Sequence, residues 1–212
     1  MKQLPRGRHG LPREFVAEHQ RERLLAAIAD LLEDHGFERT TVSAISARAS
    51  VSKSDFYRHF ESKDECFLAA YDDAVARLRE EVLAARDDRD EWADGVCAGL
   101  GAALARLAAQ PAQANLLLVE GLRAGPSVYG RFQGAVESFV PCLREGAPAG
   151  IGAVGTPRET DEAVVGGIAS LLGRRVLAGE AARIDEFFPE LAEFALSPYL
   201  GVAEARRIIS AG

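Results

Sequence analysis

A run of hydrogen-bond donors between residues 52 and 59 is the part of this sequence with the clearest capacity for chemistry. Within eight residues it carries hydroxyl, ammonium, phenol, guanidinium and imidazole groups, on Ser52, Lys53, Ser54, Tyr57, Arg58 and His59. Its one acid, Asp55, follows Ser52 by three residues, a spacing that resembles a helix-capping box. Donor groups of these types bind phosphate oxygens and base edges. The segment therefore predicts contact with nucleic acid.

Two short helices are expected to position these side chains. Thr41 is a favourable N-cap, and apolar residues follow at the spacing of one helix face, namely Val42, Ile45 and Ala49. After a short break, Phe56 and Phe60 fall on one side of a second helix. Ser62 and Glu65 then form an S-x-x-E capping box that opens a longer helix. Two short helices joined by a tight turn are a helix-turn-helix, whose second helix lies in the major groove of DNA.

This stretch resembles the DNA-binding segment of the TetR family of one-component transcriptional regulators. The positions that fit the family pattern are Thr41, Ile45, Ala49, Val51, Ser52, Phe56, Tyr57, His59, Phe60, Ser62, Lys63 and Asp64. One position departs from it, because the family usually has glycine where this chain has Ser50. Glycine there relieves a turn with positive φ. The resemblance is strongest over about residues 14–70 and looser beyond.

The resemblance and the side-chain chemistry together suggest roles at the DNA. The first residues of the second helix, Ser52, Lys53 and Ser54, are expected to reach base edges. Contacts to the phosphate backbone are expected from Thr41, Tyr57, His59 and Lys63, while Arg58 suits either role. The double-stranded DNA partner is expected to be a palindromic operator.

The fold expected for the whole chain is all-α, because no stretch has the pattern of a strand. We divide the chain into a flexible basic arm (1–13), a helix-turn-helix DNA-binding domain (14–62) and a helical regulatory domain (63–212). The arm is either a solvated tail or a segment that reaches along DNA. The expected helices cover about 14–35, 42–49, 52–60, 63–86, 90–109, 111–119, 126–144, 157–179 and 184–196, with a short last helix to about 209.

The resemblance implies that the regulatory domain binds a small-molecule effector and forms a homodimer. The helices at about 157–179 and 184–196 are expected to pair with their counterparts as a four-helix bundle. Candidate effector-binding residues are Tyr71, Trp92, Cys97, Asn115, Glu120, Arg123, Tyr129 and Phe132. Ordinary packing is the alternative for the aromatic ones, and an ion pair with Arg123 is the alternative for Glu120. Three helix glycines, at 95, 99 and 101, either admit a neighbouring helix or leave room for a ligand.

Charge distribution, cysteine spacing and the motifs present bear on which classes of function the sequence favours. The net charge is −7, yet residues 1–63 carry 11 basic and 9 acidic side chains, and the remainder 14 and 23. A mildly cationic module on an acidic body suits specific rather than non-specific DNA binding. The three cysteines have no metal-ligand or redox spacing, and the chain shows no phosphate loop, nucleophile elbow or membrane segment. We expect a cytoplasmic regulator with no catalytic residue, metal or cofactor. The alternatives are a protein-binding adaptor and, less favoured, a small-molecule enzyme.

Overall fold

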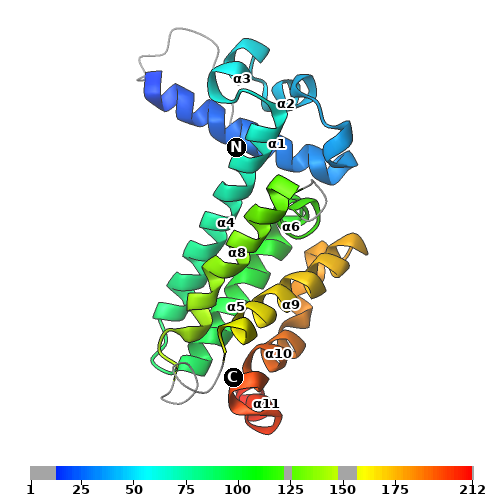
Figure 1. Cartoon of the computed structure of the whole chain (residues 1–212). Helices are drawn as coiled ribbons and strands as arrows, with labels where there is room; N and C mark the ends of the chain where they lie inside the picture. Colours follow the sequence, from blue (N-terminus) through cyan, green and yellow to red (C-terminus); the bar gives the residue numbers. More distant parts are fainter. Residues whose placement is uncertain (1–12, 122–125, 148–156, 212) are drawn as a thin grey trace.

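The computed structural model describes residues 13–121, 126–147 and 157–211, and all regular structure in these ranges is helical (Figure 1). This confirms the all-α prediction. The elements are α1 (Arg13–Arg39), α2 (Val42–Ala49), α3 (Lys53–His59), α4 (Lys63–Asp87), α5 (Trp92–Ala109), α6 (Pro111–Asn115), η1 (Leu116–Glu120), α8 (Pro126–Arg144), α9 (Arg158–Leu177), η2 (Ala181–Phe187), α10 (Phe188–Leu200) and α11 (Val202–Ala211). The predicted arm, apart from Arg13, lies outside the described residues.

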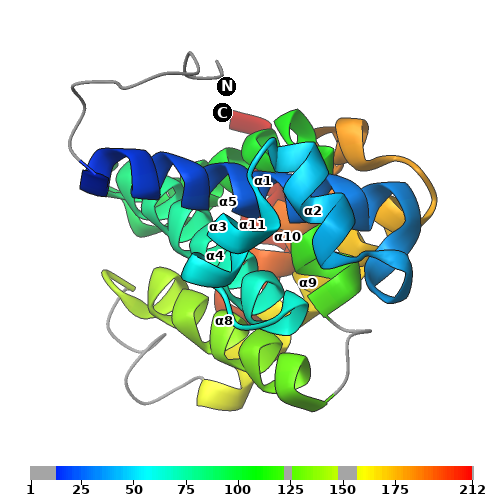
Figure 2. The ribbon, with the colours of Figure 1, turned by 90° about the horizontal axis from the view of Figure 1, so that it is seen from above.

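Helices α1, α2 and α3 form one end of the molecule, and α11 lies at the other (Figure 1). Seen from above, α1, α2 and α3 lie over the helices of the body (Figure 2). Ile45 and Phe56 are fully buried and Phe60 nearly so, so the apolar faces predicted for α2 and α3 do form the core of this end. Helix α1 runs to Arg39 but breaks at Gly36, where φ is 78°. This is the position at which the sequence predicted its end, because a left-handed conformation favours glycine.

One continuous helix, α4, connects this end to the body (Figure 1). It begins behind the Ser62 cap, whose hydroxyl accepts the Glu65 N–H at 3.1 Å, as the capping box predicted. Helix α5 packs closely along α4 because of its glycines. A Cβ at Gly99 would lie 3.3 Å from the Val82 carbonyl oxygen, and one at Gly95 would lie 3.2 Å from the Arg86 side chain. Close helix approach therefore accounts for both glycines.

The stretch after Pro111 is not a uniform helix. Five residues of α6 are followed by a π-helical turn, η1, in which Leu116 to Glu120 are all buried. Helix α9 crosses this turn at Gly173, where an added Cβ would lie 2.7 Å from the Leu118 carbonyl oxygen. Single π-turns of this kind are frequent at functional sites. Here α9 packs directly against the turn, because its residue at the crossing is a glycine.

The C-terminal helices differ from the sequence prediction in two places. The stretch from 184 begins as a 3₁₀ helix, η2, which gives way to α10 just before Pro189. The predicted end of this helix at about residue 196 was wrong, since α10 continues through Pro198 to Leu200. A proline in the last turn removes one backbone hydrogen bond, and the helix ends at Gly201, where φ is 79°.

A buried carboxylate ties three helices of the body together. Asp161, in the first turn of α9, is 1% exposed. It forms an ion pair with Arg144 at the end of α8 and accepts a hydrogen bond from the Tyr199 hydroxyl of α10. Burial, and then the hydrogen bond to Asp161, raise the pKa of Tyr199, so its hydroxyl remains a donor at neutral pH.

No helix in the described part of the chain is long and apolar enough to cross a membrane.

Candidate DNA-binding surface and effector cavity

The helix-turn-helix is built by local capping. The Thr41 hydroxyl accepts the Ala44 N–H at 3.2 Å, which starts α2. The Ser52 hydroxyl accepts the Asp55 N–H at 3.0 Å, which starts α3. Side-chain oxygens at these positions satisfy backbone donors that the first helical turn leaves unpaired. Both caps predicted from the sequence are confirmed, and Thr41 and Ser52 therefore have a structural role besides any contact with DNA.

The turn between α2 and α3 passes through Ser50, which is the non-glycine residue of the described chain with positive φ (52°, with ψ 43°). Its N–H donates to the Ala47 carbonyl at 3.1 Å, and the Arg23 guanidinium of α1 donates to the carbonyls of Ala49 and Ser50. The turn thus has the conformation that glycine provides in the family pattern, and Arg23 holds it against α1.

Replacing Ser50 by glycine is expected to stabilise the protein by about 0.5–1 kcal/mol. A left-handed conformation costs a residue with a Cβ about 1–2 kcal/mol, and the greater freedom of glycine in the unfolded chain removes part of this gain. Urea unfolding followed by circular dichroism measures the difference. The matched control is Ala47→Gly in the exposed middle of α2, which should destabilise by about 1 kcal/mol. Equal losses in both variants would contradict the argument.

The outer face of α3 is exposed and rich in donors. Lys53, Ser54, Tyr57 and Arg58 are all solvent-exposed there, and Tyr57 is 58% exposed despite its aromatic ring. Both carboxylate oxygens of Asp55 accept hydrogen bonds within the helix, one from the Ser52 hydroxyl at 2.7 Å and one from Arg58 at 2.9 Å. These bonds, that from Ser52 first, lower the pKa of Asp55. The acid thus completes the cap and leaves a surface of donors.

Two of the predicted backbone contacts, His59 and Lys63, are half-buried and already have partners. A ring nitrogen of His59 lies 3.4 Å from the Gln20 side-chain oxygen, and burial is the main cause that lowers the pKa of His59. The Lys63 ammonium donates to the Phe37 carbonyl at 2.9 Å and lies 3.9 Å from the centre of the Phe37 ring. Its remaining two N–H groups are the ones available to a phosphate.

Arg39 was not among the predicted DNA contacts, yet it is exposed at the end of α1, two residues before the Thr41 cap. This places a cation beside the N-terminus of α2, where backbone phosphates are bound in helix-turn-helix proteins. Its position in the sequence could have suggested this role, since Arg39 directly precedes Thr40 and Thr41, the pair of threonines that opens the motif.

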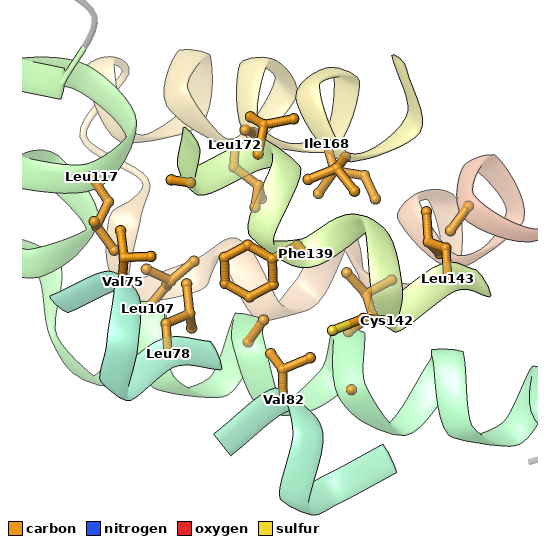
Figure 3. A pocket seen from close by; sticks show the side chains of 18 of the residues that line it. Val75, Leu78, Val82, Leu107, Leu117, Phe139, Cys142, Leu143, Ile168 and Leu172 are labelled. Carbon is orange, nitrogen blue, oxygen red and sulfur yellow. The ribbon is translucent and has the colours of Figure 1, made fainter. Parts of the chain in front are cut away.

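The body contains a partly open, apolar cavity of about 160 Å³. Figure 3 shows Phe139 in its middle, with Val75, Leu78 and Val82 of α4 on one side and Ile168 and Leu172 of α9 on the other. The side chains drawn there are carbon apart from the Cys142 sulfur. The remaining lining residues come from α4, α5, η1, α8, α9 and α10, and include Tyr71, Arg86, Gly95, Val96, Gly99, Leu100, Ala103, Leu107, Leu117, Leu118, Phe132, Ala135, Val136, Leu143, Val165, Ala169 and Ala195.

The polar head of Arg86 points away from this space and towards the end of α8. Its guanidinium donates to the carbonyls of Pro141 and Glu145 and pairs with the Glu145 carboxylate at 3.4 Å. Basic side chains commonly satisfy carbonyls at a helix C-terminus in this way. The part of Arg86 that remains beside the cavity is aliphatic, so the cavity offers an occupant no free charge from this residue.

Of the eight candidate effector-binding residues, Tyr71 and Phe132 line the cavity. Five others lie elsewhere, and the eighth, Arg123, is outside the described residues. Trp92 is buried in a second cluster, where its indole N–H donates to the Leu143 carbonyl at 2.8 Å and its ring meets Tyr199. Cys97 packs in the same cluster, and Asn115 is half-buried beside η1.

The other three candidates have different positions. Tyr129 is 51% exposed on α8. Glu120 is buried, but its carboxylate accepts the Phe37 N–H of α1 at 3.1 Å and does not face the cavity. Arg123 lies outside the described residues, and so does the ion pair considered for Glu120. The candidates were chosen for polarity or aromaticity, whereas the cavity is lined mostly by aliphatic side chains.

The three thiols are shielded. Cys66 and Cys142 are buried and Cys97 is half-buried, and none of them forms a disulfide. Burial raises the pKa of all three, that of Cys66 to about 12. Thiols in this state are poor nucleophiles. Cys142 therefore contributes to the cavity as a small apolar side chain.

An exposed donor-rich helix in a helix-turn-helix, joined by one long helix to a body with an apolar cavity, defines the class of helical DNA-binding regulators. The DNA-binding segment of the chain matches the TetR family within that class. Residues 24–70 match the family model described as bacterial regulatory proteins, tetR family, and the fold is shared with solved structures of TetR-family regulators. The matched segment and the shared fold are both found in transcriptional regulators.

Three similar proteins illustrate the match. An uncharacterised HTH-type transcriptional regulator of Mycobacterium tuberculosis is 42% identical over 55 residues, which are 26% of this chain and 27% of that protein. The HTH-type transcriptional activator FasR of Mycolicibacterium smegmatis is 30% identical over 89 residues, 40% of this chain and 41% of FasR. The transcriptional regulator FadR of Bacillus subtilis, solved in complex with stearoyl-CoA, has a TM-score of 0.73 at 12% identity and covers 85% of this chain and 98% of FadR.

The matched stretch thus spans about a quarter of the first relative and less than half of FasR. The sequence likeness is concentrated in the DNA-binding segment, while the likeness to FadR concerns the fold. The body of this chain has to be interpreted from its own residues.

Proposed function

We propose that this chain is a transcriptional repressor that binds a palindromic operator as a homodimer and is released when an apolar small molecule enters its body. The observation that carries the proposal is the outer face of α3, where Lys53, Ser54, Tyr57 and Arg58 are exposed and the one acid is tied into the cap. Such a face suits the major groove, since its first residues reach base edges and its later ones reach phosphates. We place the division between DNA-binding and regulatory parts at Lys63.

The surface of α9 and α10 supports the homodimer. Ala163, Ser170 and Leu177 are exposed at helical spacing on α9, and Phe194 is 41% exposed on α10. A Cβ at Gly166, on the same side of α9, would meet no atom of this chain within 4 Å. Glycine inside a helix costs about 1 kcal/mol, and the packing of a single chain gives no reason for it here. Close approach of a second subunit gives one, and the two α3 helices would then lie one DNA turn apart, about 34 Å.

The cavity suggests the class of effector. Its lining is mostly hydrocarbon, with the Cys142 thiol and the Tyr71 hydroxyl as its small polar groups, and its one basic side chain, Arg86, is already paired. A charged group placed there would lose its hydration without a partner, so an uncharged, mainly hydrocarbon molecule is the occupant that the site favours. The stearoyl-CoA complex of FadR supports the hydrocarbon part of this assignment, since a related fold there holds a ligand with a long hydrocarbon chain, although the coenzyme A part of that ligand is charged.

Selection of bound fragments from random DNA by the purified protein tests the DNA-binding proposal. We expect an enriched palindrome, and we expect Lys53→Ala to change the preferred bases at a cost of about 1–3 kcal/mol at the affected position. Lys63→Ala, the matched lysine at the start of α4, should weaken all sites alike and reduce the salt slope of binding by about one. A protein that enriches no sequence, or that sediments as a monomer at micromolar concentration, would contradict the proposal.

The effector class is tested in the same binding assay. Addition of 1-dodecanol, an uncharged hydrocarbon chain, should weaken binding to the selected DNA and raise the melting temperature of the free protein. The dodecyltrimethylammonium ion, with a similar chain and a fixed charge, is the comparison and should act less strongly. If the charged compound stabilised the protein more than the alcohol did, the assignment of an uncharged effector would fail.

A further inference from the structure

The backbone at the break in α1 is fully engaged by partners. The Gly36 carbonyl accepts from the Thr40 hydroxyl at 2.9 Å, and the Phe37 carbonyl accepts both from the Thr40 N–H at 3.1 Å and from Lys63 at 2.9 Å. The Phe37 N–H donates to the Glu120 carboxylate at 3.1 Å. Of these partners, Lys63 begins α4, whereas Glu120 lies in η1, 83 residues further along the chain than Phe37.

Glu120 is an unusual residue at this place. It is 5% exposed, and with Asp161 it is one of two buried carboxylates among the described residues. A buried carboxylate is costly unless it accepts hydrogen bonds, and a backbone N–H that donates to a charged group forms one of the stronger hydrogen bonds in proteins. Gly36 leaves room for the carboxylate, since even an added Cβ there would lie 3.9 Å from it.

The other end of the same short element meets the cavity. Glu120 is the last residue of η1, and Leu117 and Leu118 of that turn line the cavity. Figure 3 shows Leu117 at the cavity edge near Val75. Movement of η1 is constrained on both sides, because Gly173 crosses the Leu118 carbonyl and a Cβ at Gly121 would lie 2.7 Å from the Tyr71 ring. Because η1 is packed on both sides, it would move as a unit. An occupant that displaces Leu117 or Leu118 would therefore also move Glu120, whose carboxylate is bonded to α1.

We infer that Glu120 is the positioning residue through which cavity occupancy reaches the DNA-binding end, acting on the Phe37 N–H. With the cavity empty, the Glu120 carboxylate accepts the Phe37 N–H at the break in α1, while the Lys63 ammonium donates to the Phe37 carbonyl. With the cavity filled, η1 shifts, the Glu120–Phe37 hydrogen bond is lost, and α1 is freed relative to α4. This inference rests on the proposed function, because it assigns a route for the proposed effector.

Hydrogen exchange at the Phe37 amide, resolved by NMR on the full chain, tests the first half without any ligand. In Glu120→Ala the Phe37 amide should exchange about 10- to 100-fold faster than in the wild type, the loss expected for a hydrogen bond to a charged group. Glu120→Gln keeps the shape and one acceptor oxygen, so it should restore most of the protection. Glu137→Ala removes an exposed carboxylate of α8 and should change nothing. Unchanged exchange in Glu120→Ala, or a uniform rise over the whole chain, would overturn the inference.

DNA binding with and without 1-dodecanol tests the second half. The wild type should lose affinity when the alcohol is present, whereas Glu120→Ala should bind the alcohol with a similar thermal shift and show a ratio of DNA affinities close to one. A ratio equal to that of the wild type would overturn the coupling role. If the wild type itself bound neither DNA nor alcohol, the proposed function would fail, and the exchange comparison at Phe37 would still decide whether Glu120 holds α1.

Discussion

Replacing Arg144 by methionine is expected to lower the free energy of unfolding by about 3 kcal/mol, the largest effect we predict for a single side chain. The reason is the group left behind. Asp161 is 1% exposed, and without Arg144 its charge would be buried with the Tyr199 hydroxyl as its remaining side-chain hydrogen-bond partner among the described residues. Chemical denaturation followed by circular dichroism measures the loss.

The double variant Arg144→Met, Asp161→Leu separates the cost of a buried charge from lost packing. Replacing both members of a buried pair by apolar residues is often nearly neutral, so the double variant should recover most of the lost stability. Tyr199 is half-buried, and its hydroxyl would turn to water. Losses that simply add in the double variant would show that the two residues do not act as a pair.

Replacing Gly173 by alanine is expected to destabilise the protein by about 2 kcal/mol. The added Cβ would lie 2.7 Å from the Leu118 carbonyl oxygen, and backbone at this distance has to move. Overpacking of this kind costs about 1–3 kcal/mol or more, and the better helix propensity of alanine returns about 1 kcal/mol. The shift in the midpoint of thermal unfolding provides the measurement.

Gly134 provides the matched control for Gly173. It lies inside α8, is exposed, and a Cβ there would meet no atom within 4 Å. The same change to alanine should therefore raise stability by about 1 kcal/mol. The two variants differ only in what the new methyl group meets, so changes of the same sign would refute the close crossing of α9 over η1.

The DNA-binding end was predictable because its determinants are local. Thr41, Ser52 and Ser62 each cap a helix through a residue three positions ahead, and this spacing is visible in the sequence. The break of α1 at Gly36 was predictable for the same reason. The turn at Ser50 was also anticipated, since its left-handed conformation is the one for which the family pattern has glycine.

The cavity was not predictable in the same way. Aliphatic residues such as Leu78 and Ile168 line it, and residues of these types look the same in sequence whether they face a cavity or a packed core. The polar partner of Glu120 is a backbone N–H far away in the chain, which no side-chain pattern records. The π turn and the continuation of α10 beyond Pro198 depend on crossings and caps formed only in the folded chain.

The unbroken course of α4 has a mechanical consequence. At 1.5 Å per residue, its 25 residues form a rod of about 37 Å. If the Arg86 end stays anchored to α8, a tilt of about 5° displaces the Lys63 end by about 3 Å, close to the 3.4 Å rise of one base pair. In a dimer the two α4 helices would tilt in opposite senses. A small displacement in the body would then change the distance between the two α3 helices enough that it no longer matches one helical turn of DNA.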